Sequence, residues 1–402
     1  MLMPVISGGR LMSRTPAERI TNVEAPATLV AGERARQLAS QGRDIIDLGQ
    51  SSPYHPTPSH IVEAGVRALY DGLTNISSSR GLTDLRKAIY DKLVRHNRLT
   101  VDPNQDILIT PGSKKGLYDA INSYIGPGDE VLLVEPTWVS YRQQVELAQG
   151  IPVSVPLSEE EEYSITYQRL KDFITPKSKM IVINNPNNPT GRVYSINELE
   201  DLASLAEEYD LLVLCDETYE YFLYDDKHHI TFATLPGMWE RTLTSYTFTK
   251  SYSMSGWRLG CIVAQGTLLE PLLKVHEHTS SFVAPFIQMA GVEALTGSQA
   301  HLEVWQTDCD ILRQKVTSIL NEAEGIYCPL PEGATFVFPR FSGQYSSVEL
   351  ATLLVEQEGV VVTPGAGFGD CGESHFRIAL MRSPADQVEK AAKKISDFMG
   401  RL

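Results

Sequence analysis

The chain has 402 residues, of which 42% are hydrophobic and 21% charged, and its formal net charge is -15. This length predicts two or three domains around a large buried core, and the composition is that of a soluble globular protein. The negative charge argues against nucleic acid and anionic membrane surfaces, so we expect neither as a partner.

Two further features of the composition concern cellular location. No apolar run approaches the roughly 18 residues of a membrane span, and the N-terminus lacks the apolar stretch of a signal peptide. Five cysteines are scattered without Cys-x-x-Cys spacing. Such cysteines are typical of reduced thiols rather than of disulfides or metal sites, so we expect a cytoplasmic protein without a bound metal.

The first hundred residues predict an N-terminal arm followed by short elements. Residues 1–45 read as an arm and part of a small domain, with a helix at about 27–40. A strand at 45–48 leads into a proline-rich loop, which proline excludes from a helix interior. Helices are expected from 59 to about 69 and again after 83.

Seven apolar runs begin at residue 107, and helical stretches separate most of them. The runs lie at 107–110, 130–135, 151–156, 180–184, 211–215, 243–248 and 259–264. Near-continuous Val, Ile and Leu predict strands covered on both faces, hence an α/β fold with a mainly parallel seven-stranded sheet. We expect a large domain over 46–300 and a smaller α/β domain over 301–402. Ligands of such sheets bind beyond the carboxyl ends of the strands.

The most informative stretch, residues 247–260, follows one of these runs. Lys250 lies just past the run, Thr247 and other hydroxyl residues flank it, and Arg258 comes eight residues later. A lysine that forms a Schiff base needs a dry site, and a phosphate needs hydroxyls and a guanidinium. The pattern therefore favours a reactive lysine beside a phosphate site.

Other polar residues also follow strands. Asp216 ends the run 211–215, where a buried acid needs a partner. Gly112, Ser113 and Lys114 precede a helix, whose N-terminus favours an anion. Trp138 follows another strand, where an aromatic side chain can stack on a flat heterocycle.

Arg377 is different, because it lies inside an apolar strand near the C-terminus. An unpaired guanidinium is unfavourable there, and its planar fork suits a carboxylate. We therefore expect Arg377 to bind an acidic group.

Together these segments resemble the fold-type I, class I and II aminotransferases of the aspartate aminotransferase superfamily, which use pyridoxal 5'-phosphate. The resemblance extends from about residue 40 to 400 and includes an Asn-Pro-Thr-Gly motif at 188–191. It implies the following cofactor-binding residues: Gly112, Ser113, Lys114, Trp138, Asn188, Asp216, Tyr219, Thr247, Lys250 and Arg258. It also implies Lys250, Asp216 and Tyr219 as catalytic residues, and Arg377, Ser51 and Asn188 as substrate contacts.

The resemblance further implies the reaction. An α-amino group moves from an amino acid to a 2-oxo acid, at active sites formed at a homodimer interface. Lys250 carries the α-proton, Asp216 keeps the ring nitrogen protonated, and Arg377 binds the substrate α-carboxylate. Asn188 and Tyr219 hydrogen-bond the phenolic oxygen of the cofactor.

Two positions depart from the family pattern. Ile76 stands where the family has a tyrosine that reaches the phosphate of the partner subunit, unless Ser77, Ser78 or Ser79 replaces it. Ser51 stands where the family has a glycine near the substrate carboxylate.

These departures keep a lyase or cyclase that uses the same cofactor, by β- or γ-elimination or replacement, open as an alternative. Residues 328–341 resemble capreomycidine synthase, a cyclase of this kind. A non-catalytic sensor of the cofactor or of amino acids is a third interpretation, disfavoured because the acidic chain has no helix-turn-helix extension.

Overall fold

The computed structural model describes residues 16–21, 23 and 35–401. Most of the predicted arm therefore lies outside the described residues. It contributes the short helix α1 (Glu18–Thr21), and of the helix predicted at about 27–40, residues 35–40 are helical. Within the described part of the chain, no helix combines the length and apolarity needed to cross a bilayer.

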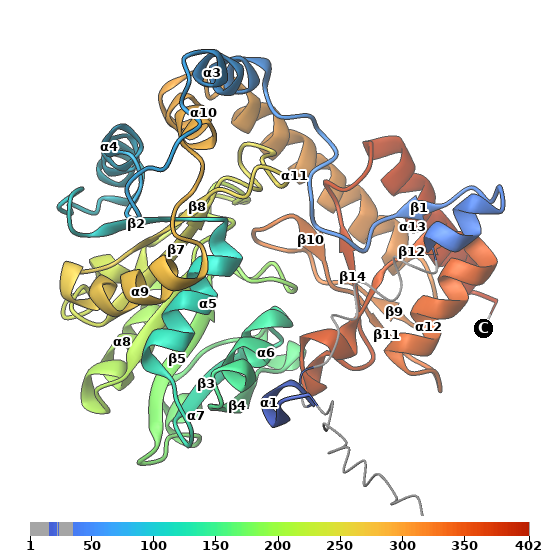
Figure 1. Ribbon diagram of the computed structural model, residues 1–402. Coiled ribbons are helices and arrows are strands. Elements are labelled where there is room, and N and C mark those ends of the chain that lie inside the picture. The colour runs from blue at the N-terminus through green and yellow to red at the C-terminus, as the bar shows by residue number, and fades with distance from the viewer. Residues whose placement is uncertain (1–15, 22, 24–34, 402) are drawn as a thin grey trace, which may run out of the picture.

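The predicted seven-stranded sheet is confirmed, in the order β2-β8-β7-β6-β5-β3-β4 (Figure 1). Its strands are β2 (Ile107–Thr110), β3 (Glu130–Glu135), β4 (Ile151–Pro156), β5 (Ser178–Asn184), β6 (Leu212–Asp216), β7 (Thr242–Thr247) and β8 (Gly260–Val263). Only β8 runs against its neighbours, β7 and β2. It does so because the chain turns back after β7, and that turn carries Lys250.

Successive residues of a strand point to opposite faces, so each strand serves two cores. Leu133 packs with α5 (Ser113–Tyr124), α6 (Ser140–Leu147) and α9 (Gly266–Thr279) on one face. Its neighbour Leu132 packs on the opposite face, with α7 (Tyr167–Lys171) and α8 (Ile196–Glu208).

That opposite face extends past β2 and β8 to a group of three helices. These are α3 (Ser59–Tyr70), α4 (Thr83–Lys92) and α10 (Pro285–Thr296). Helices therefore cover both faces, which explains why the strands read as continuous apolar runs.

Another core gathers residues from 305–399 together with Ile46, Leu48, Phe222 and Tyr224. The domain boundaries given above remain a prediction. The strands here are β1 (Ile46–Asp47) paired with β12 (Val360–Val361), β10 (Phe336–Val337) with β14 (Phe376–Ala379) and β13 (Thr363–Pro364), and β9 (Ile326–Tyr327) with β11 (Arg340–Phe341). The helices are α11 (Ala300–Asn321), α12 (Ser347–Leu353) and α13 (Ala385–Met399). Single helical turns at 93–97, 159–161, 232–234, 354–358, 365–368 and 370–372 complete the described elements.

Candidate active site

A pocket of about 230 Å³ opens beyond the carboxyl ends of the central strands. It brings together all of the predicted site residues except Gly112 and Arg377, which lie just behind its wall. The lining consists of Ser51, Ser113, Lys114, Trp138, Tyr141, Asn184, Asn188, Asp216, Thr218, Tyr219, Thr247, Thr249, Lys250 and Arg258. Segments from five different strands thus converge on one cavity, as the position of ligands in such sheets predicts.

Lys250 lies in the turn after β7 and is only 8% exposed. Burial, and next the positive charge of Arg377, lower the pKa of its amine to about 7, although Asp216 acts in the opposite direction. Its Nζ donates to the carbonyl oxygen of Ser51 at 2.7 Å and contacts the Ser51 Oγ at 2.8 Å. An amine that is partly neutral near pH 7 can act as a nucleophile and as a base.

Asp216 is the last residue of β6, and its side chain is buried. Tyr141 Oη donates to it at 2.8 Å, and the Thr218 hydroxyl donates at 2.6 Å. Burial raises the pKa of this carboxyl group, and the two hydrogen bonds partly oppose that rise. The Thr218 backbone N–H also donates to this carboxyl group, at 3.2 Å. A buried carboxylate that has only neutral partners among the described residues suits a cationic ring nitrogen as its remaining partner.

The opposite end of the pocket presents groups that can bind an anion. Gly112 precedes α5 with a φ of 80°, and a Cβ there would lie 2.4 Å from Arg258 Nη2. Only glycine therefore lets the guanidinium approach the start of the helix, where Ser113 is the first residue. Thr247 and Thr249 add hydroxyls 3.0 Å apart. Free N–H groups, hydroxyls and a guanidinium form a phosphate site.

Lys114 and Trp138 form another side of the pocket. The Lys114 Nζ lies 4.9 Å from the centre of a Trp138 ring, in a cation–π contact. Burial, and next the charge of Arg258, lower the pKa of Lys114. The indole ring meets Tyr141 edge-on. Trp138 thus lines the cavity, and its role as a stacking residue stays a prediction.

Arg377 lies on β14 and is 3% exposed. It donates to Asn188 Oδ1 at 2.8 Å and to the Gly49 carbonyl at 2.7 Å, and it stacks against the ring of Phe336. Burial lowers the pKa of its guanidinium to about 10. Among residues 35–401 no acid forms an ion pair with it, and its Nε is a buried donor without a partner. A carboxylate brought by a ligand would supply the missing charge.

The sequence-based prediction missed four lining residues: Tyr141, Asn184, Thr218 and Thr249. Asn184 illustrates their role, since its Nδ2 donates to the backbone of Asp216 and its Oδ1 accepts from the Asn188 backbone N–H at 2.7 Å. Asn184 ends a strand, and Thr218 and Thr249 lie two residues beyond one, and that proximity is the signal that could have identified these three. Tyr141 lies in α6 and lacks that signal.

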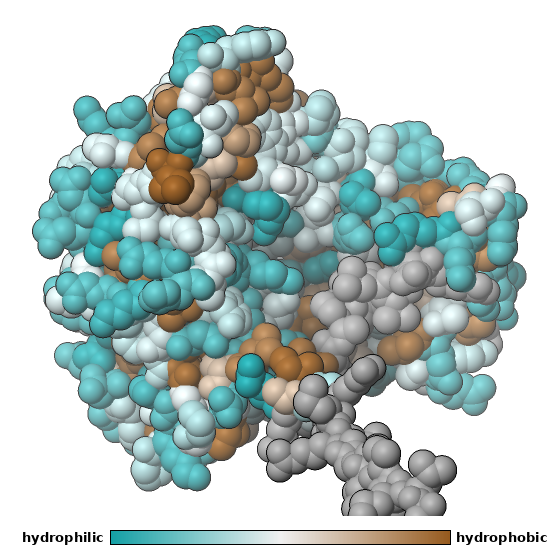
Figure 2. Space-filling view, in the orientation of Figure 1, coloured by the Kyte–Doolittle hydropathy of each residue, from teal (hydrophilic) through white to brown (hydrophobic). Residues whose placement is uncertain are grey.

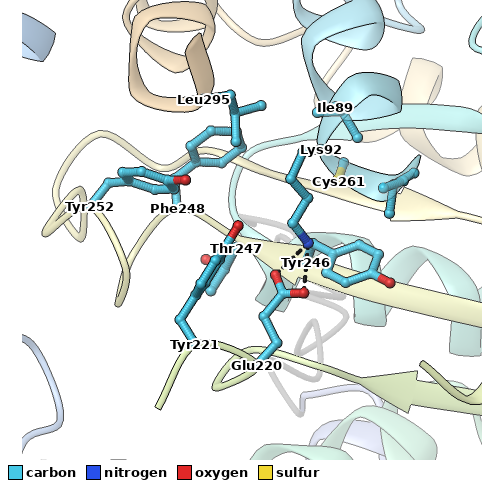
Figure 3. Close-up of a pocket in the computed structure, with 11 residues that line it drawn as sticks. Ile89, Lys92, Glu220, Tyr221, Tyr246, Thr247, Phe248, Tyr252, Cys261 and Leu295 are labelled. Carbon is cyan, nitrogen blue, oxygen red and sulfur yellow. Dashed lines mark hydrogen bonds and ion pairs between the residues drawn. The ribbon is translucent and has the colours of Figure 1, made fainter. Parts of the chain in front are cut away.

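A buried polar network lies behind the pocket wall, and Figure 3 shows part of it. We call it the rear cluster: Lys92, Glu217, Glu220, His229 and Tyr246. The Lys92 amine lies 2.5 Å from Glu220, Tyr246 Oη donates to Glu217 at 2.8 Å, and His229 Nε2 is 2.9 Å from Glu217. The ligand atoms of the two acids and the histidine lie within 4.8 Å of one another, as in a metal site. The amine of Lys92 already provides the cation there.

A deeply buried lysine between a carboxylate and a phosphate cradle fits pyridoxal 5'-phosphate. The two ends match its ring nitrogen and its phosphate, Trp138 matches its flat ring, and Lys250 matches its aldehyde. Fold and site together thus define a cofactor-dependent enzyme of amino-acid chemistry.

Comparison with known proteins makes the assignment specific. Residues 43–395 match the family model for aminotransferase class I and II. The chain is 37% identical over 366 residues to an aspartate aminotransferase of Pyrococcus abyssi, covering 89% of this chain and 94% of that one. An aromatic-amino-acid aminotransferase 2 of Thermococcus litoralis shows the same identity and coverage.

Solved structures agree with the sequence comparison. The structure of Thermus thermophilus aspartate aminotransferase with maleate superposes with a TM-score of 0.90 at 32% identity, covering 96% of this chain and 99% of that one. The chain therefore belongs to the class I and II aminotransferases and is a pyridoxal-phosphate-dependent transferase, as the sequence predicted.

Proposed function

We propose that the chain carries out transamination with Lys250 as the proton carrier and Arg377 as the anchor of the substrate α-carboxylate. The observation that carries this proposal is the buried Lys250 amine, whose pKa is lowered to about 7 between Asp216 and two guanidinium groups. When bound, pyridoxal phosphate supplies a ring that accepts electrons from the α-carbon of the substrate.

The chain's own residues would direct that chemistry. Arg377 holds the carboxylate, and through Asn188 it is linked to the cavity where the α-carbon must lie. Asp216 holds a proton at the ring nitrogen, because its buried carboxylate stabilises a cation there. Lys250 would remove the α-proton of the substrate and later give a proton back, acting first as base and then as acid.

We infer acidic and aromatic amino acids as the donors to test first. The names of relatives support this choice. Two are aspartate aminotransferases, from Musicola paradisiaca and Bacillus subtilis, and one is an aromatic-amino-acid aminotransferase, from Thermococcus litoralis. Arg377 accounts for an α-carboxylate in every case.

A single-turnover experiment tests the proposal. The holoenzyme is mixed anaerobically with one amino acid and no oxo acid, and cofactor absorbance and products are followed. We expect one equivalent of 2-oxo acid and a lasting loss of the yellow colour. Ammonia or a cyclised product with return of the yellow colour would establish the lyase or cyclase alternative instead. Lys250→Ala should show neither.

We also infer a homodimer, because the residues that the structure describes leave an apolar face of α3 uncovered. Val62, Val66, Leu69 and Tyr70 are exposed along this helix, and Ile76 beyond it is 86% exposed. Figure 2 shows hydrophobic side chains gathered at the end of the molecule where α3 and α10 lie. A second copy of the chain is the proposed occupant. A cytoplasmic location is inferred from five free cysteines, four of them buried.

A further inference from the structure

Among residues 35–401, Ser51 is the residue that hydrogen-bonds the amine of Lys250. The Nζ atom lies 2.7 Å from the Ser51 carbonyl oxygen and 2.8 Å from its Oγ, although the two residues are 199 positions apart. A carbonyl oxygen can only accept a hydrogen bond, whereas a hydroxyl can donate and accept. The two atoms of Ser51 therefore offer the amine different partners.

That difference matters for a lysine that moves protons. A charged amine has three donors and no acceptor, so it can donate to both oxygens of Ser51. A neutral amine has a lone pair, so it can donate to the carbonyl and accept from the hydroxyl. Burial lowers the pKa of Lys250 to about 7, so both forms are populated near neutral pH. The hydroxyl can satisfy the amine in either form without moving.

The loop that carries Ser51 is fixed at both ends. The Gly49 carbonyl accepts from Arg377 Nη2 at 2.7 Å, which ties the loop to β14. Thr57 Oγ1 donates to the Ser253 carbonyl at 2.8 Å, which ties the loop to the lysine segment. The hydroxyl therefore has a defined position relative both to the lysine and to the carboxylate anchor.

Ser51 also reaches a second residue of the site. Burial raises the pKa of the Tyr219 phenol, and a hydrogen bond with the Ser51 side chain acts in the opposite direction. The Tyr219 ring lies beneath the lysine, with its centre 5.8 Å from Nζ. The hydroxyl of Ser51 is thus shared by the lysine and the tyrosine at the reacting end of the pocket.

We propose that Ser51 is a positioning residue that holds the free Lys250 amine during the part of the reaction in which the lysine is not attached to the cofactor. The inference rests on the proposed role of Lys250 as proton carrier. It differs from the sequence-based expectation, which placed Ser51 at the substrate. A glycine at this position would offer the carbonyl alone.

The first test uses the apoenzyme, in which the lysine is free. Reductive methylation with formaldehyde is followed at Lys250 by mass spectrometry in wild type, Ser51→Gly, Ser51→Thr and Ser52→Gly. Without the Ser51 hydroxyl, the lone pair of the neutral Lys250 amine is no longer hydrogen-bonded, or the charged form of the amine is less stable. Either effect makes the amine more reactive and speeds labelling. We expect Lys250 to react roughly two- to tenfold faster in Ser51→Gly, because this ratio corresponds to the net free energy of one hydrogen bond.

The matched variants decide whether the hydroxyl is responsible. Ser51→Thr keeps the hydroxyl and Ser52→Gly changes only the neighbouring serine, so both should label like wild type. Equal labelling of wild type and Ser51→Gly would overturn the inference. Equal acceleration in Ser52→Gly would also overturn it, because a loosened loop would then explain the effect.

The second test measures proton transfer in the holoenzyme with α-protio and α-deuterio amino acid. We expect Ser51→Gly to slow the single-turnover step roughly two- to tenfold, with a larger isotope effect and an unchanged KM. An unchanged rate and isotope effect would overturn the inference while leaving transamination intact. Failure of the wild type to transaminate would instead contradict the proposed function. The labelling of the apoenzyme would still show whether the Ser51 hydroxyl holds the Lys250 amine.

Discussion

Arg377 has a buried guanidinium group that forms no ion pair with an acid among residues 35–401. We predict that Arg377→Lys raises KM for both the amino acid and the oxo acid by roughly ten- to hundredfold, because the forked, charge-assisted contact is lost. Steady-state kinetics with varied donor and acceptor measure this effect. Arg382→Lys is the control, since Arg382 pairs with Asp47 at 3.2 Å and should leave KM unchanged. Equal KM values in both variants would exclude Arg377 as the anchor.

Lys250 should titrate near neutrality in the apoenzyme. Burial, followed by Arg377, lowers its pKa to about 7, so the amine is charged below that pH and neutral above it. Only the neutral amine attacks an aldehyde. Stopped-flow uptake of pyridoxal phosphate should therefore speed up to about pH 7 and then level off. A rate that keeps rising toward about pH 10, as for an ordinary lysine, would contradict the lowered pKa.

At the scale of elements, the turn into α5 depends on Gly112. An added Cβ would lie 2.4 Å from Arg258 Nη2, so Gly112→Ala should displace the guanidinium from the phosphate site. We expect the affinity for the cofactor to fall roughly tenfold or more, because this ratio corresponds to the net free energy of one charge-assisted hydrogen bond.

Gly128 provides the matched control for this prediction. It also has a positive φ, at 89°, but nothing lies within 4 Å of its Cβ position. Gly128→Ala should therefore share the backbone strain and keep the cofactor affinity. Titration of each apoenzyme with pyridoxal phosphate separates the two effects, and equal losses would refute the steric argument.

The rear cluster joins α4 to the turn after β6. Lys92 and Glu220 have side chains only 9% and 7% exposed, so removal of one partner leaves an unpaired buried charge. We predict that Lys92→Met lowers the free energy of unfolding by about 3–5 kcal/mol, measured by urea denaturation. The double variant Lys92→Met, Glu220→Gln should recover part of that loss. A double variant that is less stable than Lys92→Met would show that the charge is not the cause.

The elements were largely predictable because each sheet strand is an apolar run of its own. The helix expected from 59 does begin there, as α3, but its capping position is occupied by Pro58, which forms no side-chain cap. A proline before a serine fixes the extended backbone that a cap needs, and local sequence does not rank the two residues.

The site was predictable to the extent that its residues follow strands directly. Asp216 and Lys250 lie at strand ends, where the fold class alone places ligands. The contact of Ser51 with Lys250 was not predictable, because it joins a loop of one core to a turn of another. The same is true of Tyr141, whose bond to Asp216 depends on the rotation of α6.

At the scale of the whole molecule, the exposed apolar side chains of α3 provide a test of the proposed homodimer. We predict that the 44.6 kDa chain sediments as a dimer and that Val66→Asp shifts it toward the monomer, because a charge would be buried at the contact. Val348→Asp is the control, since Val348 on α12 is similarly exposed, at 53%, on a different part of the molecule. A monomeric wild type at micromolar concentration would rule out the proposed dimer.

The pairing of β1 with β12 also dictates an order of assembly on the ribosome. All seven strands of the large sheet have been synthesised once residue 263 is made, so this sheet can form on a nascent chain. β1, made near the start, has no partner until residues 360–361 emerge. Synthesis of the roughly 100 residues between β8 and the end of β12 takes on the order of 5–20 s at roughly 5–20 residues per second. During that interval Lys250 has been made but Arg377, the proposed carboxylate anchor, has not. We therefore expect a nascent chain to hold no amino acid until translation is nearly complete.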